Sequence, residues 1–187
     1  MTVMGRPRKF SREGVLQKAL PVFWKYGFAR TTLPDLEQAT GVNKSGLYAE
    51  FESKEALFLA CLRHYLDTRN GAALLVTEPL GWENIERFLE EVPSCASDQR
   101  GCFIVNSMRE LDGLPAEARK VIADASAKLK QLLRANIAFE KPNIDVNSLC
   151  ELISAFFSGI CIETNLTPDR KRVRRKIRNF MQMVRAA

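Results

Sequence analysis

The chain has 187 residues, of which 46% are apolar and 27% charged, and its formal net charge is +6. No run of residues is judged long and apolar enough to span a bilayer, and no apolar signal core follows the basic N-terminus, so we expect a cytoplasmic protein without a membrane partner. The five cysteines form no C-x-x-C pair, and the sequence has no G-x-S-x-G, H-E-x-x-H or phosphate-loop motif. These features argue against a metal site, a cofactor and an enzyme.

The first ten residues are predicted to form an extended basic arm, because a helix cannot run through Pro7 here. The sequence G-R-P-R is similar to the core of an AT-hook, in which two arginines, here Arg6 and Arg8, lie in a narrow minor groove. A solvated basic tail that also includes Lys9 is the alternative, and four residues do not decide between the two. Residues 1–70 hold 11 lysines and arginines against 7 acidic residues, a balance that suits a polyanion-binding module.

A first helix is predicted to start after Ser11, a good N-cap residue, and to stop at Gly27. Apolar residues at i, i+3, i+4 and i+7 give it one buried face. Pro21 lies inside this pattern and is expected to kink the helix or distort its hydrogen bonds.

The next two helices are short and lie close together. One is expected to begin near Thr32, whose T-x-x-D spacing to Asp35 resembles a capping box, and to end at Gly41. The other is predicted from Lys44 to about Glu50, with Asn43 as its N-cap. Two short helices joined by a three-residue turn form a helix-turn-helix, and a helical hairpin with no DNA role is the alternative.

The second of these helices has a small and polar outward face suited to a major groove. Gly46 within it costs roughly 1 kcal/mol relative to alanine, which a close approach of the backbone to DNA would explain. A fourth helix is predicted after Ser53, with one apolar stripe. Further helices are predicted over residues 82–92, 102–112, 115–139, 146–164 and 168–185. Loops are predicted over residues 70–81 and 140–145.

Residues 12–62 resemble the DNA-binding domain of the TetR (tetracycline repressor) family. The resemblance rests on F-W-K-Y-G-F followed by T-T, on A-T-G-V-N-K-S-G-L-Y and on F-E-S-K-E-A-L, in matching order and spacing. The segment G-C-F-I-V-N-S-M-R-E-L also looks like one found in a subset of the family. Leu36 and Glu37 depart from the pattern, because many members have Ile-Ala there.

The resemblance implies an all-α fold with an N-terminal three-helix DNA-binding domain that contains the helix-turn-helix, and a C-terminal helical domain for ligand binding and dimerisation. We expect a flexible basic arm over 1–10 and a DNA-binding domain over 11–53, with the start of the fourth helix to about 62. The effector-binding and dimerisation domain is expected over 54–187. The implied partner is double-stranded operator DNA with an inverted repeat, bound by a homodimer.

The resemblance also assigns roles to individual residues. Thr32 is expected to bind a phosphate through its hydroxyl and backbone N–H, which agrees with the preference of helix N-termini for anions. Phosphate contacts fix register and base contacts specify sequence; Tyr48 has a packed aromatic as its alternative role. The expected DNA contacts, besides the arm residues Arg6, Arg8 and Lys9, are Thr32, Asn43, Lys44, Ser45, Gly46, Tyr48 and Lys54.

The family dimerises through its last two helices. Residues 149–162 are apolar nearly all round, as in a helix buried in a core or a subunit interface. The last helix repeats apolar residues at four, three and four, which is a packing seam. Its other faces are basic. These basic residues could be solvated, pair with acidic residues of the chain, or bind an anionic partner. The predicted dimer residues are Phe156, Ile160, Val173, Ile177, Phe180 and Val184.

The signal is expected to reach the C-terminal domain. An unknown small-molecule effector would bind between its helices, in a pocket lined by apolar and aromatic residues with a few polar ones. Thiol chemistry at Cys102 or Cys95 is the second possibility, because a helix start and a nearby cation stabilise a thiolate at Cys102. The candidate pocket residues are Tyr65, Trp82, Phe88, Phe103, Asn106 and Phe157.

The sequence therefore predicts a transcriptional repressor that is nucleoid-associated when bound to DNA and is released by a small-molecule or thiol-reactive signal. An activator remains an alternative within the same class. A helical adaptor that binds no DNA and acts through the basic C-terminal helix is the alternative from another class.

Overall fold

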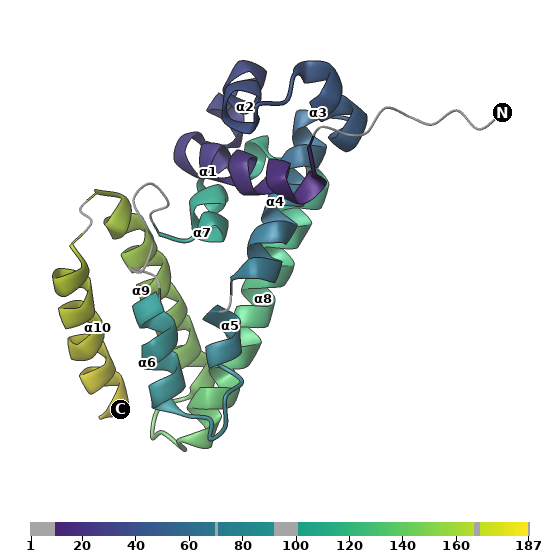
Figure 1. The fold of residues 1–187 in the computed structure, drawn as a ribbon. Coiled ribbons are helices and arrows are strands. Elements are labelled where there is room, and N and C mark those ends of the chain that lie inside the picture. The colour runs from purple at the N-terminus through teal and green to yellow at the C-terminus, as the bar shows by residue number, and fades with distance from the viewer. Residues whose placement is uncertain (1–9, 70, 92–100, 167–168, 187) are drawn as a thin grey trace.

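A computed structural model describes residues 10–69, 71–91, 101–166 and 169–186, and all regular structure in these ranges is helical, which confirms the predicted all-α class. Figure 1 shows α1, α2 and α3 at one end of the molecule, the long helix α8 running from there to the turn into α9 at the opposite end, and α10 along one side next to α6 and α9. The helices are α1 Arg12–Arg30, α2 Leu33–Thr40, α3 Lys44–Phe51, α4 Lys54–Thr68, α5 Gly71–Leu74, α6 Trp82–Glu91, α7 Phe103–Ser107, the 3-10 helix η2 Met108–Gly113, α8 Ala116–Phe139, α9 Val146–Leu166 and α10 Arg170–Arg185.

Three local predictions need correction. Helix α1 continues through Pro21, and its non-helical residue is Gly27, with φ 78° and ψ 172°. A proline φ is compatible with a helix, and packing of α1 on α4 offsets the missing hydrogen bond. The helix predicted over 102–112 is two pieces, because the chain changes from α-helix to 3-10 helix after Ser107, and Glu110 within the second piece is non-helical at φ −118° and ψ 15°. The short helix α5 lies in a stretch predicted to be a loop.

The end of the molecule that contains the helix-turn-helix has a core that does not close by itself. Its hydrophobic cluster includes buried residues of α1 to α4, and also Phe103 and Ile104 of α7 and Ile122 of α8. The second cluster joins α6, α8, α9 and α10 at the other end. The two clusters therefore lie next to each other along α7 and α8, and the partly buried Cys102 packs against both.

An aromatic group lies where α1, α4 and α7 meet. The ring of Phe103 stacks on Trp24 at 5.6 Å and meets Phe58 and Tyr65 edge-on at 5.7 and 5.8 Å. Phe103 is 1% exposed. Aromatic pairs at these distances contribute about 0.5–1.5 kcal/mol each beyond their buried area. This group fixes α7 against both helices.

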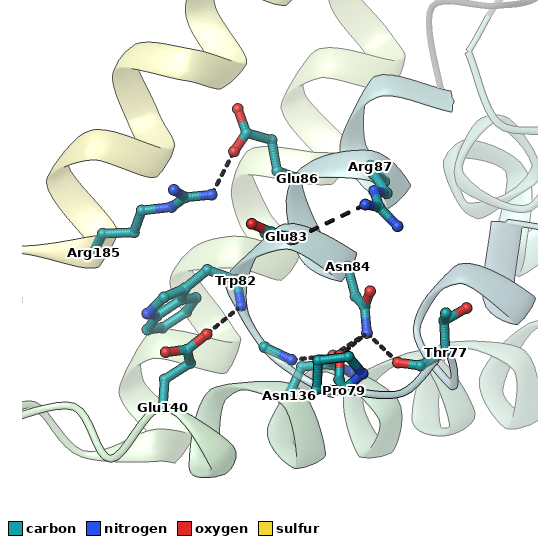
Figure 2. Close-up of polar contacts among 11 residues, drawn as sticks. Thr77, Pro79, Trp82, Glu83, Asn84, Glu86, Arg87, Asn136, Glu140 and Arg185 are labelled. Atoms are coloured by element: carbon teal, nitrogen blue, oxygen red, sulfur yellow. Dashed lines mark hydrogen bonds and ion pairs between the residues drawn. The ribbon is translucent and has the colours of Figure 1, made fainter.

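A buried amide network fixes the segment before α6 (Figure 2). Asn136 of α8 accepts from the backbone N–H of Gly81 at 2.9 Å and donates to the carbonyl of Leu75 at 2.8 Å. Asn84 donates to Asn136 and to the carbonyl of Thr77. Every buried side-chain polar atom in the described residues has a partner.

The apolar stripe of α10 packs inside its own chain. Val173, Ile177 and Val184 are 0–5% exposed and belong to the second cluster, as does Ile160 of α9. Their prediction as dimer residues is therefore corrected, because a helical stripe looks the same whether it covers its own core or a partner. Phe156 and Phe180 stack on each other at 3.7 Å and stay half-buried.

Helix α9 also corrects the expectation that no segment is long and apolar enough to cross a membrane. By length and composition α9 passes that test, which core helices of soluble proteins also pass, and 33% of its most apolar window is buried. Its buried side faces α7 and α8, Phe157 stacks on Phe88 of α6, and the exposed apolar residues are Leu152, Ile162 and Leu166.

Replacing Asn136 by alanine is expected to lower the free energy of unfolding by about 2–3 kcal/mol, because it removes the partner of buried amide and carbonyl groups. A chain of this size should then melt about 5–10 °C lower. The matched control is Asn179→Ala, since Asn179 is an exposed residue of α10. Differential scanning calorimetry of the two variants checks the prediction, and equal melting temperatures would contradict it.

Candidate DNA-binding interface and effector cavity

The turn between α2 and α3 has the geometry of a helix-turn-helix. Gly41 ends α2 in the left-handed region at φ 71°, and its N–H donates to the carbonyl of Glu37. Asn43 caps α3 by accepting from the N–H of Gly46 at 3.0 Å. The buried residues Leu36, Val42 and Leu47 fill the crossing of the two helices. Both predicted caps and the predicted turn are confirmed by these contacts.

Three of the predicted DNA contacts lie on the outer side of α3. Lys44 and Ser45 are exposed, and the half-buried Tyr48 lies next to them on the same side of the helix. The Lys44 ammonium is 5.8 Å from the centre of the Tyr48 ring. This face combines one cation, one hydroxyl and one phenol, groups that bind phosphates and base edges.

The structure gives Gly46 a different role from the predicted one. A Cβ at this position would lie 2.7 Å from Cγ1 of Val42, 3.1 Å from the Asn43 side chain and 3.3 Å from Phe10. Gly46 thus allows α3 to pack on its own turn, and that contact accounts for the glycine without DNA.

Thr32 is exposed, but its donors are already used. Its N–H and hydroxyl both donate to the carboxylate of Asp35, at 2.8 and 2.5 Å. The hydroxyl bond, followed by the backbone bond, lowers the pKa of Asp35. This capping box confirms the predicted start of α2, and a phosphate at Thr32 would have to replace Asp35.

The Lys54 ammonium is bound within the protein. Its ammonium donates to the carbonyls of Phe28 and Thr31, both at 3.0 Å, and lies 4.5 Å from the centre of the Phe28 ring. These contacts correct the predicted DNA role, because the first turn of α4 faces the end of α1. The arm residues Arg6, Arg8 and Lys9 lie outside the described residues.

Two contacts that place α3 were not found from the sequence. Arg12 of α1 donates to the carboxylate and the carbonyl of Glu50, at 3.1 and 3.0 Å, and so ties α3 to α1. The carboxylate of Glu37 accepts from the N–H of Lys44 at the start of α3. The partners are 38 and 7 residues apart, so no local motif indicates them.

A second feature is a cavity of about 540 Å³ between α4, α6, α7, α8 and α9. Its volume suits a small organic ligand. Its walls are mainly apolar, with charged groups from Arg69, Glu91, Lys130 and Glu151. The apolar and aromatic lining comprises Tyr65, Leu66, Ala72, Phe88, Ile104, Val105, Met108, Ala125, Leu129, Ala155 and Phe157.

Three of the six predicted pocket residues line this cavity, namely Tyr65, Phe88 and Phe157. The rings of Phe88 and Phe157 stack at 4.9 Å. The other three lie elsewhere. Phe103 belongs to the aromatic group, Trp82 lies in the second core with its backbone N–H bound to Glu140, and Asn106 accepts from the amide of Asn165 at 2.9 Å. Phe103 and Asn106 also line a second space of about 850 Å³ between α1, α7 and η2, so residue type alone did not show which cavity a residue lines.

The thiol of Cys102 also lines the cavity, and it is held by specific donors. The hydroxyl of Tyr65 donates to Cys102 Sγ at 3.3 Å. The pKa of Cys102 is lowered to about 6, first by the hydrogen bond from the Cys161 thiol and then by Tyr65 and the backbone N–H groups of Val105 and Ile104. Burial, together with Cys102, raises the pKa of Tyr65.

Gly101 makes this arrangement possible, because a Cβ there would overlap the carbonyl oxygen of Cys161. The lowered pKa favours the thiolate form of Cys102 relative to an ordinary cysteine. Burial has the opposite effect on Cys61, whose pKa it raises. Cys95 lies outside the described residues.

An apolar outer face extends over α9 and α10. Leu152 and Leu166 of α9 are 56% and 80% exposed, and Met183 of α10 is 66% exposed. The half-buried pair Phe156 and Phe180 lies between the two helices. Exposed apolar side chains gathered on neighbouring helices are typical of a subunit interface.

The comparisons with known proteins agree with this geometry. Residues 15–61, which lie within α1 to α4, match the family described as "Bacterial regulatory proteins, tetR family". The N-terminal domain of the chain, over residues 15–61, therefore belongs to the TetR family. Members of this family are DNA-binding transcription regulators rather than enzymes.

The similarity extends over most of the chain. The HTH-type transcriptional repressor ComR of Escherichia coli (strain K12) is 29% identical over 170 residues, which cover 84% of this chain and 81% of ComR. YezE of Bacillus subtilis (strain 168), an uncharacterised HTH-type transcriptional regulator, is 28% identical over 182 residues and covers 91% of this chain and 94% of YezE. A cysteine mutant of the TetR-family regulator CifR, complexed with 26bp double-strand operator DNA, matches with a TM-score of 0.83 and 27% identity, over 95% of this chain and 98% of CifR.

The reactivity of Cys102 is expected to rise with a midpoint near pH 6, where an unperturbed cysteine has its midpoint near 8.5. The sign follows from the lowered pKa, since the reactive thiolate is present above pH 6 and is lost as the pH falls through it. Alkylation by iodoacetamide, followed at the Cys102 peptide by mass spectrometry from pH 5 to 9, measures this midpoint. Cys161→Ala should move it upward more than Tyr65→Phe, because the Cys161 bond is the larger cause. A wild-type midpoint near 8.5 would contradict the assignment.

Proposed function

We propose that this TetR-family protein is a transcriptional repressor. It binds an inverted repeat in double-stranded DNA as a homodimer and leaves the DNA when a molecule reaches the cavity beside Cys102. The observation that supports the proposal most directly is the outer face of α3, where Lys44, Ser45 and Tyr48 are presented by a capped helix on a rigid turn. CifR, whose structure matches this chain over nearly its full length, is bound to operator DNA.

A single protomer has one such face, and two half-sites one helical turn apart need two of them. The apolar outer face of α9 and α10 supplies the surface for a second copy. Leu152, Leu166 and Met183 would be removed from water there, and the Phe156–Phe180 pair lies at its centre. This assignment keeps the predicted helices and replaces most of the predicted residues.

The signal is best explained by an apolar, thiol-reactive molecule. The cavity supplies apolar walls, and Cys102 supplies a thiolate that opens into it. An electron-poor conjugated alkene would accept the thiolate at its β-carbon. The S–C bond forms, the C=C π pair moves to the α-carbon, and that carbon takes a proton from water. Alternatively, a ligand of the same shape could occupy the cavity without reacting. The variant Cys102→Ser distinguishes the two cases, because it removes the reactive thiolate.

One observation still supports the alternative of a helical adaptor that acts through α10. Lys171, Arg174, Arg175 and Arg178 form an exposed basic face on α10. Deleting α10 would not test it cleanly, because the inner stripe of that helix is part of the core. Charge substitutions on the exposed face are the appropriate test.

Selection from a genomic fragment library is expected to return an inverted repeat. Binding to it should weaken with salt by about 0.9 in log–log slope per phosphate contact. Lys44→Ala should weaken binding and reduce the slope if it contacts a phosphate, whereas Lys171→Ala removes the same charge from the exposed side of α10 and should change neither. Tyr48→Ala should cost about 1–3 kcal/mol, and Tyr48→Phe separates the phenol from the ring.

Fluorescence anisotropy over 50–300 mM salt measures these affinities. Absence of any enriched fragment, together with no binding at low salt, would refute the DNA-binding function and favour the adaptor.

The double variant Leu152→Glu with Met183→Glu is expected to turn the dimer into a monomer, because it puts charges into the apolar outer face. Analytical ultracentrifugation at micromolar concentration measures the change. The control is Arg174→Glu with Arg178→Glu, which alters an exposed face that we do not assign to the dimer. A dimer that survives the first pair of substitutions would show that the interface lies elsewhere.

A further inference from the structure

The carboxylate of Glu110 contacts the end of α1 across 81 residues of sequence. Its Oε2 atom accepts from the N–H of Ala29 at 2.9 Å. It reaches this position because α1 breaks at Gly27, where a Cβ would overlap the Glu110 carboxylate. The break and the carboxylate therefore require each other.

Residues 27–32, here called the α1–α2 junction, are held from two sides. The Lys54 ammonium of α4 binds the carbonyls of Phe28 and Thr31. Glu110 of η2 binds an N–H between them. The Glu110 carboxylate thus binds a backbone N–H of the junction, and the Lys54 ammonium binds two of its backbone carbonyls. Hydrogen bonds to charged groups of this kind are stronger than those between neutral groups. The junction leads directly into α2 and the helix-turn-helix.

Glu110 belongs to the same short segment as the cavity wall. Cys102 and Met108 line the cavity, and Glu110 follows Met108 by two residues. Figure 1 shows α7 lying beside α1 at the level where the helix-turn-helix end meets the rest of the molecule. A shift of η2 driven from the cavity would therefore move the Glu110 carboxylate relative to Ala29.

We propose that Glu110 is a positioning residue for DNA binding, which fixes the α1–α2 junction in the orientation that presents α3 and changes that orientation with the state of the cavity. Glu110 itself touches neither DNA nor effector. The proposal rests on the proposed function as a DNA-binding repressor. The contact accounts for a carboxylate that the sequence motifs left without a role.

The first test measures binding of the wild type and of Glu110→Ala to the selected operator and to an unrelated duplex. The alanine variant should bind the operator about 5- to 150-fold more weakly, the range of typical coupling between sites. Its binding to the unrelated duplex should be unchanged, because every cation of the DNA face remains. Glu110→Gln keeps an acceptor oxygen in place and should restore operator binding to within about threefold. Asp112→Ala, an exposed carboxylate in the same 3-10 helix, should have no effect.

Operator binding by Glu110→Ala at the wild-type level would overturn the proposal. So would a parallel loss on both duplexes with a lower melting temperature, because that result indicates a folding defect. A wild-type protein that binds no operator would refute the proposed function instead, so the two failures are distinguishable.

The second test is a double-mutant cycle between the cavity and Glu110. Ala125→Phe fills part of the cavity from α8. Its effect on operator affinity should be present with Glu110 and reduced at least threefold with Glu110→Ala, since coupled sites are not additive. Additive effects, or no effect of Ala125→Phe in either background, would show that the cavity does not act through Glu110.

Discussion

The packing of Phe103 against Trp24, Phe58 and Tyr65 is the contact on which the rest of the structure depends. It fixes α7 between α1 and α4, and α7 in turn sets the positions of Cys102 before it and η2 after it. On one side Cys102 meets the hydroxyl of Tyr65, and on the other η2 brings Glu110 to Ala29. A DNA-binding end and a cavity are thus joined through one buried ring and the short segment that contains it.

The same segment explains why the thiol and the cavity belong together. Gly101 lets the chain pass against Cys161, and the hydrogen bonds to Cys102 lower the pKa of its thiol beside an apolar space. Burial without such donors has the opposite effect, as the raised pKa of Cys61 shows. A small molecule and a thiol-reactive signal, which the sequence left as alternatives, therefore have the same location in the proposed mechanism.

Electrostatic contacts within the protein decide which charged residues face outward on the DNA-binding end. Lys54 donates to the carbonyl of Thr31 at the α1–α2 junction, and the Thr32 hydroxyl donates to Asp35. Lys44 and Ser45, in contrast, are exposed on α3. The resemblance to the family assigned DNA contacts to all four of these residues. The structure narrows the proposed reading face to the exposed side of α3, where the Ser45 hydroxyl also donates to Asn43 Oδ1 at 3.1 Å.

The sequence by itself determined the helical class, the caps at Thr32 and Asn43, the turn at Gly41 and the extent of most helices, because these depend on residues within one or two turns of each other. Only the tertiary structure decided that the stripe of Val173 and Ile177 covers its own core, that Lys54 binds the end of α1, that Gly46 allows α3 to pack on its own turn, and that Glu110 reaches α1. The reason is physical. Helical periodicity shows that a face is buried but not what buries it, and the partners of Cys102, Lys54 and Glu110 lie 23 to 81 residues away in the chain.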